Sequence, residues 1–294
     1  MKLLGLVLIV LLLFPVLPLL LVGLSMPSLG RPTTLPTDQR LATAEGTWRF
    51  EDAGTGDHAL VLLHGFNQGL EQWDAVWAGL AACPVRRLRV DLPGFAGSRF
   101  TGAEFGLPSQ ATRLLALLQA RGVHRVTLAG VSMGGSLAAW FAAKYPGRVS
   151  QVALFAPSGY PDALTHPGLF GLLVKPGPLN RAASRVADTW LFAQLFPRSA
   201  ALQALTVTAS YGAPWAEALP RIEAPTLVVW SRLDPVADAG TAESVVRLIP
   251  RGRLLWLDAG AGHSAPNTRP ERVAGLLCRL AQGQSPAEVI APQL

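Results

Sequence analysis

Short apolar runs alternate with helical patterns along most of this 294-residue chain, and this alternation constrains its fold more than any other feature. A continuous apolar run such as residues 59–63 is typical of a strand that is buried on both faces of a sheet. Strands that alternate with helices build a mostly parallel sheet covered by helices. We therefore predict an α/β fold with a mostly parallel central sheet flanked by helices.

The expected strands are residues 47–51, 59–63, 86–91, 125–129, 149–155, 226–230 and 253–257, and the expected helices are residues 109–121, 133–144, 239–248 and 270–281. The alternation stops at residues 160–221, which are rich in proline, glycine and aromatic residues. We predict that this insertion is a helical cap between two sheet strands. Ligands bind at the carboxyl ends of the strands in such sheets, so the cap would cover the site. The core is then residues 45–159 and 222–283, followed by a C-terminal tail, residues 284–294.

The first 25 residues are expected to be a membrane anchor. Residues 3–24 carry no charge, and as a helix they would span roughly 33 Å, enough for a hydrocarbon core of about 30 Å. No small-x-small cleavage motif follows, but a cleaved signal peptide is the alternative. Lys2 favours a cytoplasmic amino terminus and an extracytoplasmic main domain, whereas Arg31 and Arg40 favour the reverse. The alternative localisation is secreted or periplasmic. Residues 26–44, rich in proline and threonine, are predicted to be a linker.

The formal charge of +6 comes from scattered arginines and not from a basic run, so we expect no nucleic-acid partner. A weak attraction to anionic lipid headgroups is the expected consequence of the charge. Cys83 and Cys278 match no metal-ligand spacing. We interpret them as small buried apolar residues, with a disulfide between them as the open alternative.

Residues 130–135, Gly-Val-Ser-Met-Gly-Gly, follow a predicted strand and open a predicted helix. A serine hydroxyl is a weak nucleophile that needs exposure, a base and oxyanion donors. A sharp turn with small neighbours exposes Ser132 in this way. The alternative reading is an ordinary tight turn with a serine helix cap.

Two further residues follow the last strands of the predicted sheet. His263 lies in a glycine-rich loop after residue 257, from which it could reach Ser132 as a base. Asp234 comes just after residue 230, where an acid would orient the imidazole. The rival acids are Asp238, Asp258 and Asp162. The backbone N–H groups of Phe66, after a buried strand, and Met133 are the expected oxyanion donors.

In this order, the motifs His64-Gly65-Phe66, residues 91–98, residues 130–134, Asp234 and His263 resemble the α/β-hydrolase superfamily over residues 45–283. The resemblance implies the α/β-hydrolase fold, with Ser132 as nucleophile, His263 as base and Asp234 as orienting acid. It also implies that residues 91–98 form a structural loop. Relatives with an aspartate at the strand-to-helix turn, such as haloalkane dehalogenases and epoxide hydrolases, are disfavoured because this chain has a serine there.

These residues predict a serine hydrolase that cleaves a carboxylic ester through an acyl-serine intermediate, without a metal or organic cofactor. The cap aromatics would form an apolar or lipid-like acyl pocket, or would only fasten the cap to the core; they are Phe170, Trp190, Phe192, Phe196, Tyr211 and Trp215. Two alternatives stay open. One is hydrolysis of a carbon–carbon bond in a ring-cleavage product, and the other is a catalytically silent binding protein at the membrane.

Overall fold

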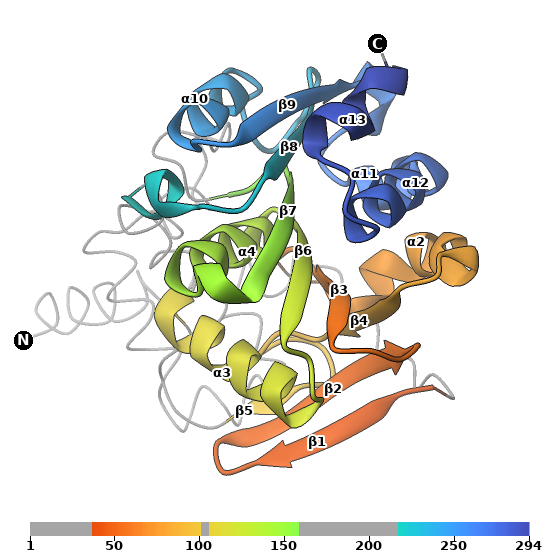
Figure 1. Ribbon diagram of the computed structural model, residues 1–294, viewed down its shortest axis with the longest axis vertical. Helices are drawn as coiled ribbons and strands as arrows, with labels where there is room; N and C mark the ends of the chain where they lie inside the picture. The colour runs from red at the N-terminus through yellow and green to blue at the C-terminus, as the bar shows by residue number, and fades with distance from the viewer. Residues whose placement is uncertain (1–36, 67, 101–105, 159–216, 294) are drawn as a thin grey trace, which may run out of the picture.

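The computed structural model describes residues 37–66, 68–100, 106–158 and 217–293. Within these residues one sheet of nine strands has the order β1-β2-β4-β3-β6-β7-β8-β9, with β5 paired to β2 (Figure 1). The strands are β1 (Gln39–Thr43), β2 (Gly46–Ala53), β3 (His58–Leu63), β4 (Arg86–Val90), β5 (Arg99–Phe100), β6 (Arg125–Val131), β7 (Val149–Phe155), β8 (Thr226–Ser231) and β9 (Gly252–Leu257). The pairs from β4 to β9 are parallel, and β1, β2 and β5 pair antiparallel.

Helices cover both faces of the sheet (Figure 1). The α-helices are α2 (Asp74–Gly79), α3 (Leu107–Ala120), α4 (Met133–Lys144), α10 (Gly240–Leu248), α11 (Ala265–Thr268), α12 (Pro270–Ala281) and α13 (Pro286–Ile290). Short 3-10 turns are η1 (Leu70–Trp73), η2 (Leu80–Ala82), η3 (Pro146–Arg148), η4 (Leu219–Arg221), η5 (Ala259–Ala261) and η6 (Ala291–Gln293). Figure 1 shows α3 and α4 on one side of the sheet and α2, α12 and α13 on the other.

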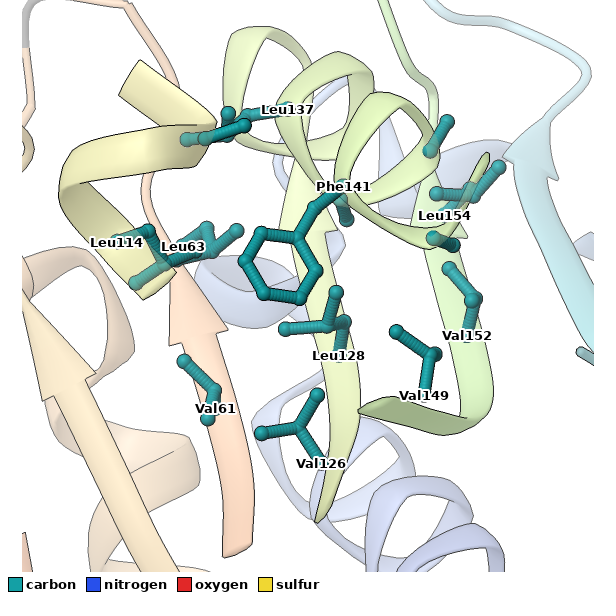
Figure 2. Packing of buried hydrophobic residues seen from close by; sticks show 14 of the residues in the cluster. Val61, Leu63, Leu114, Val126, Leu128, Leu137, Phe141, Val149, Val152 and Leu154 are labelled. Atoms are coloured by element: carbon teal, nitrogen blue, oxygen red, sulfur yellow. The ribbon is translucent and has the colours of Figure 1, made fainter. Parts of the chain in front are cut away.

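Alternate residues of each central strand belong to different halves of the core. In β3, Val61 and Leu63 pack with the cluster that includes α3 and α4, whereas Leu60 and Leu62 pack with the cluster that includes α2 and α12. Side chains point alternately to the two faces of a strand, so a strand buried on both faces reads as a continuous apolar run. Figure 2 shows the first cluster, with Phe141 of α4 lying over the central strands.

The predicted α/β fold with a mostly parallel sheet flanked by helices is confirmed. Every predicted strand and helix of the core is present, with ends shifted by at most a few residues. The strands that flank the predicted cap, β7 and β8, are parallel neighbours. Residues 160–216 of the predicted cap and residues 1–36, with the predicted anchor, lie outside the described residues. Among those that are described, no helix has the length and apolarity to cross a membrane.

Two segments differ from the expectation. Residues 39–43, predicted as the end of a linker, form β1, which pairs antiparallel with β2. Its residues are exposed or half-buried, so the strand lacks the apolar pattern that predicted the others. Within residues 284–294, predicted as a tail, Ser285 and Glu288 make reciprocal hydrogen bonds that start α13. Val289 is buried in the second core cluster, so this short helix belongs to the fold.

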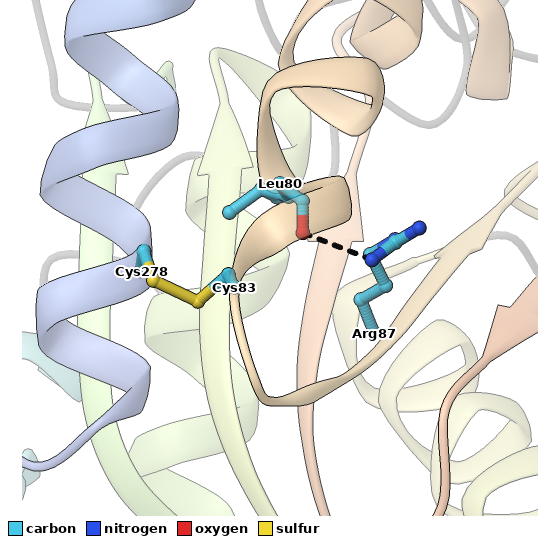
Figure 3. The surroundings of a disulfide bond; sticks show 4 residues. All are labelled: Leu80, Cys83, Arg87 and Cys278. Carbon is cyan, nitrogen blue, oxygen red and sulfur yellow. Dashed lines mark hydrogen bonds between the residues drawn. A yellow bond between two sulfur atoms is a disulfide. The ribbon is translucent and has the colours of Figure 1, made fainter.

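Cys83 and Cys278 form a disulfide across 195 residues of sequence, which corrects the interpretation of two unpaired buried cysteines. The bond joins the loop after η2 to α12 (Figure 3). The Arg87 guanidinium donates to the Leu80 carbonyl at 2.9 Å beside it. Two residues so far apart in sequence meet only because α2 and α12 pack on the same face of the sheet.

Candidate active site

Ser132 occupies the sharp turn between β6 and α4. Its backbone has a φ of 50° and a ψ of −115°, a conformation that costs a residue with a side chain on the order of 1–3 kcal/mol. Hydrogen bonds hold the turn, because the Ser132 carbonyl oxygen accepts from the N–H groups of Ser136 and Ser158, both at 3.1 Å. Ser132 is half-buried between two buried neighbours. The turn therefore lifts this residue out of the core at the carboxyl end of the sheet.

Two glycines let the backbone pack tightly around the turn. A Cβ atom at Gly134 would overlap the carbonyl oxygens of Leu63 and His64, at the end of β3. A Cβ atom at Gly130 would overlap the Gly134 carbonyl in the same way. The glycine spacing in residues 130–134 is thus required by close backbone contact, and it seats the start of α4 against the end of β3.

His263 and Asp234 form a hydrogen-bonded pair beyond the ends of β9 and β8. The His263 Nδ1–H donates to Asp234 Oδ2 at 2.8 Å. The other carboxylate oxygen, Oδ1, accepts from the N–H groups of Val236 at 2.8 Å and Ala237 at 2.9 Å. The Asp234 side chain is fully buried, while 18% of the His263 side chain is exposed. The acid is fixed by its own loop and orients an imidazole that solvent reaches.

The rival acids that the structure describes have other partners. Asp238 accepts from the N–H of Gly240 at 3.1 Å, where α10 begins. Asp258 is exposed and pairs with Arg269, whose hydrogen bond lowers the pKa of the Asp258 carboxyl. Asp162 lies outside the described residues. Only Asp234, of the candidates described, contacts His263.

Ser132, Asp234 and His263 follow β6, β8 and β9, so all three lie at the edge of the sheet where the parallel strands end. In the part of the chain that the structure describes, the acid and the base are joined, but the Ser132 hydroxyl makes no hydrogen bond to the His263 ring. Bonds between a nucleophile and its base are often long before a substrate binds.

The segment His64-Gly65-Phe66 turns the chain back over the end of β3. The N–H of Leu92 donates to His64 Nε2 at 2.9 Å, so the ring proton is on Nδ1 and is donated to the Gly65 carbonyl at 2.7 Å. Burial lowers the pKa of His64, so the ring is neutral. Phe66 packs edge-on against Phe95, with ring centroids 6.1 Å apart.

Met133 is the first residue of α4. The first N–H groups of a helix have no carbonyl partner within the helix, so they can bind an anion. The Met133 N–H therefore has the position expected of an oxyanion donor next to Ser132. Phe66 supplies the second predicted N–H from the loop after β3, which packs against the same turn.

Residues 91–98 have the predicted structural role. The buried Asp91 carboxylate accepts from the N–H groups of Leu70 at 2.7 Å and Gly97 at 2.6 Å, and from Arg49 at 3.1 Å.

No sequence pattern singled out Gln72, whose amide contacts Gly65, in the loop after β3, and Ser264, in the loop after β9. A single glutamine carries no sequence signal, because only the fold brings its two partners together.

The cap residues proposed to contact substrate lie outside the described residues; they are Phe170, Trp190, Phe192, Phe196, Tyr211 and Trp215. Within the described ranges, no group of three or more histidine, cysteine or acidic side chains is arranged to hold a metal ion.

Comparison with known proteins gives a consistent result. A family model for the alpha/beta hydrolase fold matches residues 58–195. Lipase 3 of Moraxella sp. (strain TA144) is 27% identical over 264 residues, which are 78% of this chain and 77% of that lipase. The dihydrolipoyllysine-residue acetyltransferase component of the acetoin cleaving system of Pseudomonas putida is 29% identical over 71% of this chain. The chain spans 62% of that relative's length, less than two thirds.

The solved structure of a thermophilic esterase from Thermogutta terrifontis is similar with a TM-score of 0.65 and 25% identity, covering 83% of this chain and 98% of the esterase. The sheet order, the strained serine turn and these matches together define a hydrolase of the α/β class. The chain has the α/β-hydrolase fold, and the proteins similar to it include esterases and lipases.

Proposed function

We propose that the protein hydrolyses a carboxylic ester through an acyl intermediate on Ser132. The observation that carries this proposal is the buried Asp234 carboxylate bound to His263 Nδ1 at 2.8 Å, at the sheet edge that also bears the strained Ser132 turn. A hydrogen bond at Nδ1 fixes the ring proton there and leaves Nε2 as the basic nitrogen. A neutral imidazole held in this tautomer is the base that a serine hydroxyl needs.

In the proposed reaction, Ser132 Oγ attacks the ester carbonyl carbon while His263 Nε2 takes the hydroxyl proton. The tetrahedral intermediate expels the alkoxide, which receives that proton and leaves as an alcohol. Water then attacks the acyl-serine with His263 again as base, and the acid is released with Ser132 restored. Asp234 stabilises the imidazolium that forms in each half of the reaction.

The negative charge on the carbonyl oxygen needs donors that are in place before the reaction. The N–H groups of Phe66 and Met133 are the proposed pair, because one lies in the loop after β3 and the other at the start of α4, and both segments adjoin Ser132. Removing one such donor typically costs about 10²–10³ in kcat. The tight packing of Gly134 against Leu63 and His64 supports a fixed spacing between the two elements.

For the substrate we propose an apolar or lipid-like acyl group. The similarity to Lipase 3 of Moraxella over 78% of the chain supports this choice, as do the aromatic residues of the predicted cap, among them Trp190, Phe192 and Trp215. A panel of nitrophenyl esters of increasing acyl length tests it. We expect turnover to rise from acetate to medium-length chains. A preference for acetate would contradict an apolar acyl pocket.

We also propose that residues 3–24 attach the protein to a membrane and that the hydrolase domain lies outside the cytoplasm. The disulfide between Cys83 and Cys278 supports this location, since structural disulfides persist in oxidising compartments and are rare in the cytoplasm.

A fluorophosphonate probe tests the nucleophile, because it reacts with an activated serine whatever the natural substrate is. We expect the wild-type protein to be labelled and Ser132→Ala to be unlabelled. No labelling of the wild type, or equal labelling of Ser132→Ala, would contradict a serine mechanism and would favour a silent binding protein. Turnover of vinylogous diketones in preference to nitrophenyl esters would favour carbon–carbon bond hydrolysis instead.

A further inference from the structure

The side chain of Gln72, in η1, joins two loops of the candidate site. Its Oε1 accepts from the N–H of Gly65 at 2.7 Å, in the loop that carries Phe66. Its Nε2 donates to Ser264 Oγ at 3.1 Å, in the loop that carries His263. Ser264 lies 192 residues further along the chain, so this is a direct link between the loop after β3 and the loop after β9.

Only one orientation of the Gln72 amide satisfies both partners. The N–H of Gly65 can only donate, so the amide oxygen must face it, and the amide nitrogen then faces the Ser264 hydroxyl. The same hydrogen bond occupies the Gly65 N–H, so Gly65 itself is not the oxyanion donor of this loop. One side chain therefore holds the spacing between the proposed oxyanion loop and the loop of the proposed base.

The element that carries Gln72 is itself fixed on both sides. The N–H of Leu70 donates to Asp91 at 2.7 Å, and Glu71 pairs with Arg49 at 2.7 Å. The Arg49 side chain is fully buried. Burial would lower the pKa of its guanidinium, but hydrogen bonds and charge from Asp38, Asp91 and Glu71 raise the pKa instead. Arg49 thus stays charged, and η1 has an ionic anchor.

Gln72 also lies beside the Ser132 turn. A Cβ atom built on Gly65 would lie 3.6 Å from the Gln72 Oε1 and 3.6 Å from the Ser132 Cβ. The Gln72 amide and the serine therefore border the same glycine. The Gln72 amide is connected to the site by its hydrogen bonds to Gly65 and Ser264.

We propose that Gln72 is a positioning residue for ester hydrolysis, which holds the Phe66 N–H and His263 in the relative placement that acyl transfer requires. This inference rests on the function proposed above. Misplacing a catalytic group by about 1 Å can cost roughly 10²-fold in rate, so loss of the link should lower kcat more than it changes KM.

The test compares Gln72→Leu, Ser264→Ala and the double variant in the full-length chain, with a nitrophenyl ester as the probe substrate. We expect Gln72→Leu to lower kcat by about 10- to 100-fold with KM changed less than threefold. Ser264→Ala should lower kcat less, because the bond to Gly65 remains. The double variant should lose no more than Gln72→Leu, since both changes break one link.

Gln151→Leu is the matched control. The Gln151 amide also joins distant segments, donating to the carbonyls of Leu280 at 3.1 Å and Gln284 at 2.8 Å, but it lies at the opposite end of β7 from the candidate site. Its loss should lower the melting temperature and leave kcat unchanged. If Gln72→Leu does not fold, Ser264→Ala alone tests the link, and an unchanged kcat in it overturns the proposal.

An unchanged kcat in Gln72→Leu, or losses that multiply in the double variant, would also overturn the positioning role. These outcomes are distinct from failure of the proposed function, which would leave the wild type without esterase activity and without labelling by the fluorophosphonate. If the wild type has esterase activity and Gln72→Leu has the same kcat as the wild type, only the positioning role is refuted.

Discussion

Asp234 and Asp238 are only four positions apart, but their carboxylates have different hydrogen-bond partners. Asp234 binds His263 at 2.8 Å, whereas Asp238 accepts from the N–H of Gly240, the first residue of α10. We predict that Asp234→Asn lowers kcat by roughly 10⁴-fold, because the amide no longer holds the ring proton at Nδ1. The control, Asp238→Asn, should keep a kcat close to that of the wild type. Full activity in Asp234→Asn, measured by ester turnover, would move the acid assignment to another residue.

The buried ring of His64 makes stability depend on pH. Its pKa is lowered by burial, so between the folded pKa and the unfolded value of about 6.5 the unfolded chain binds more protons than the folded chain. This contribution to the free energy of unfolding is therefore present above pH 6.5 and is lost as the pH falls below it. We predict a loss of up to about 1.4 kcal/mol per pH unit from this one group. Urea unfolding at several values between pH 7.5 and 5.5 measures it.

His64→Asn and His124→Asn separate this effect from the titration of carboxylates. Removing the buried ring should flatten the pH dependence of the unfolding free energy between pH 7.5 and 5.5, even though the variant is less stable throughout. His124 is exposed and lies outside the core, so His124→Asn controls for the loss of a histidine as such. Equal slopes in all three proteins would show that another group causes the acid sensitivity.

The junction of β3, β6 and α4 depends on backbone contact at Gly134. A Cβ atom there would overlap two carbonyl oxygens, and no flexible side chain can move aside to make room. We predict that Gly134→Ala lowers both the melting temperature and kcat, because α4 must shift away from the end of β3 and take the Met133 N–H with it. Parallel thermal unfolding and ester turnover of the purified variant measure the two effects.

Gly275→Ala in α12 is the opposite case. A Cβ atom at this exposed helical position meets nothing within 4 Å. Alanine should therefore stabilise α12 by about 0.5–1 kcal/mol, as expected for a glycine removed from a helix interior. If Gly134→Ala were as well tolerated as Gly275→Ala, the close contact at the strand-to-helix turn would not constrain this fold.

At the scale of elements, the sequence predicted the strands and helices whose burial leaves a recognisable pattern of apolar residues. Residues 59–63 of β3 and residues 152–155 of β7 are all apolar, because helices cover both faces of the sheet. β1 leaves no such pattern, because its position at the edge of the sheet keeps its side chains half-buried or exposed. The start of α13 has a capping signal at Ser285 and Glu288, but five residues are too short for helical periodicity to be recognised.

The candidate site was predictable where chemistry requires a residue type at a fixed place in the fold. Ser132, Asp234 and His263 follow three strands, and the strand order brings their loops to one edge. The contacts of Gln72 were not predictable, because they depend on the spacing of two loops and not on a motif. The link between Cys83 and Cys278 was not predictable for a similar reason, since only the packing of α2 on α12 brings them together.

At the scale of the whole molecule, the disulfide closes a loop of 195 residues that includes most of the sheet. Cross-linking restricts the unfolded chain, and native disulfides commonly contribute about 2–5 kcal/mol. We predict that the Cys83→Ser, Cys278→Ser double variant loses stability within this range and keeps its kcat at low temperature, since both positions lie away from the sheet edge that bears Ser132. Denaturant unfolding of the two proteins under non-reducing conditions measures the difference. An equal stability would mean that the packing of α2 on α12 suffices without the covalent bond.

The same two cysteines report on the compartment in which the protein folds. If residues 3–24 direct the domain out of the cytoplasm, the chain meets oxidising conditions and both thiols are consumed by the disulfide. Cells are lysed in a maleimide reagent of high mass, which adds to free thiols and slows the protein on a denaturing gel. The full-length protein should then keep its mobility unless its disulfide is first reduced. Deleting residues 1–25 should leave the domain in the cytoplasm, where the thiols stay reduced and two reagent molecules add. The double serine variant, which cannot react, is the control for incidental labelling. Modification of the full-length protein at both cysteines without reduction would contradict an extracytoplasmic domain, because the bond would then be absent where the protein resides.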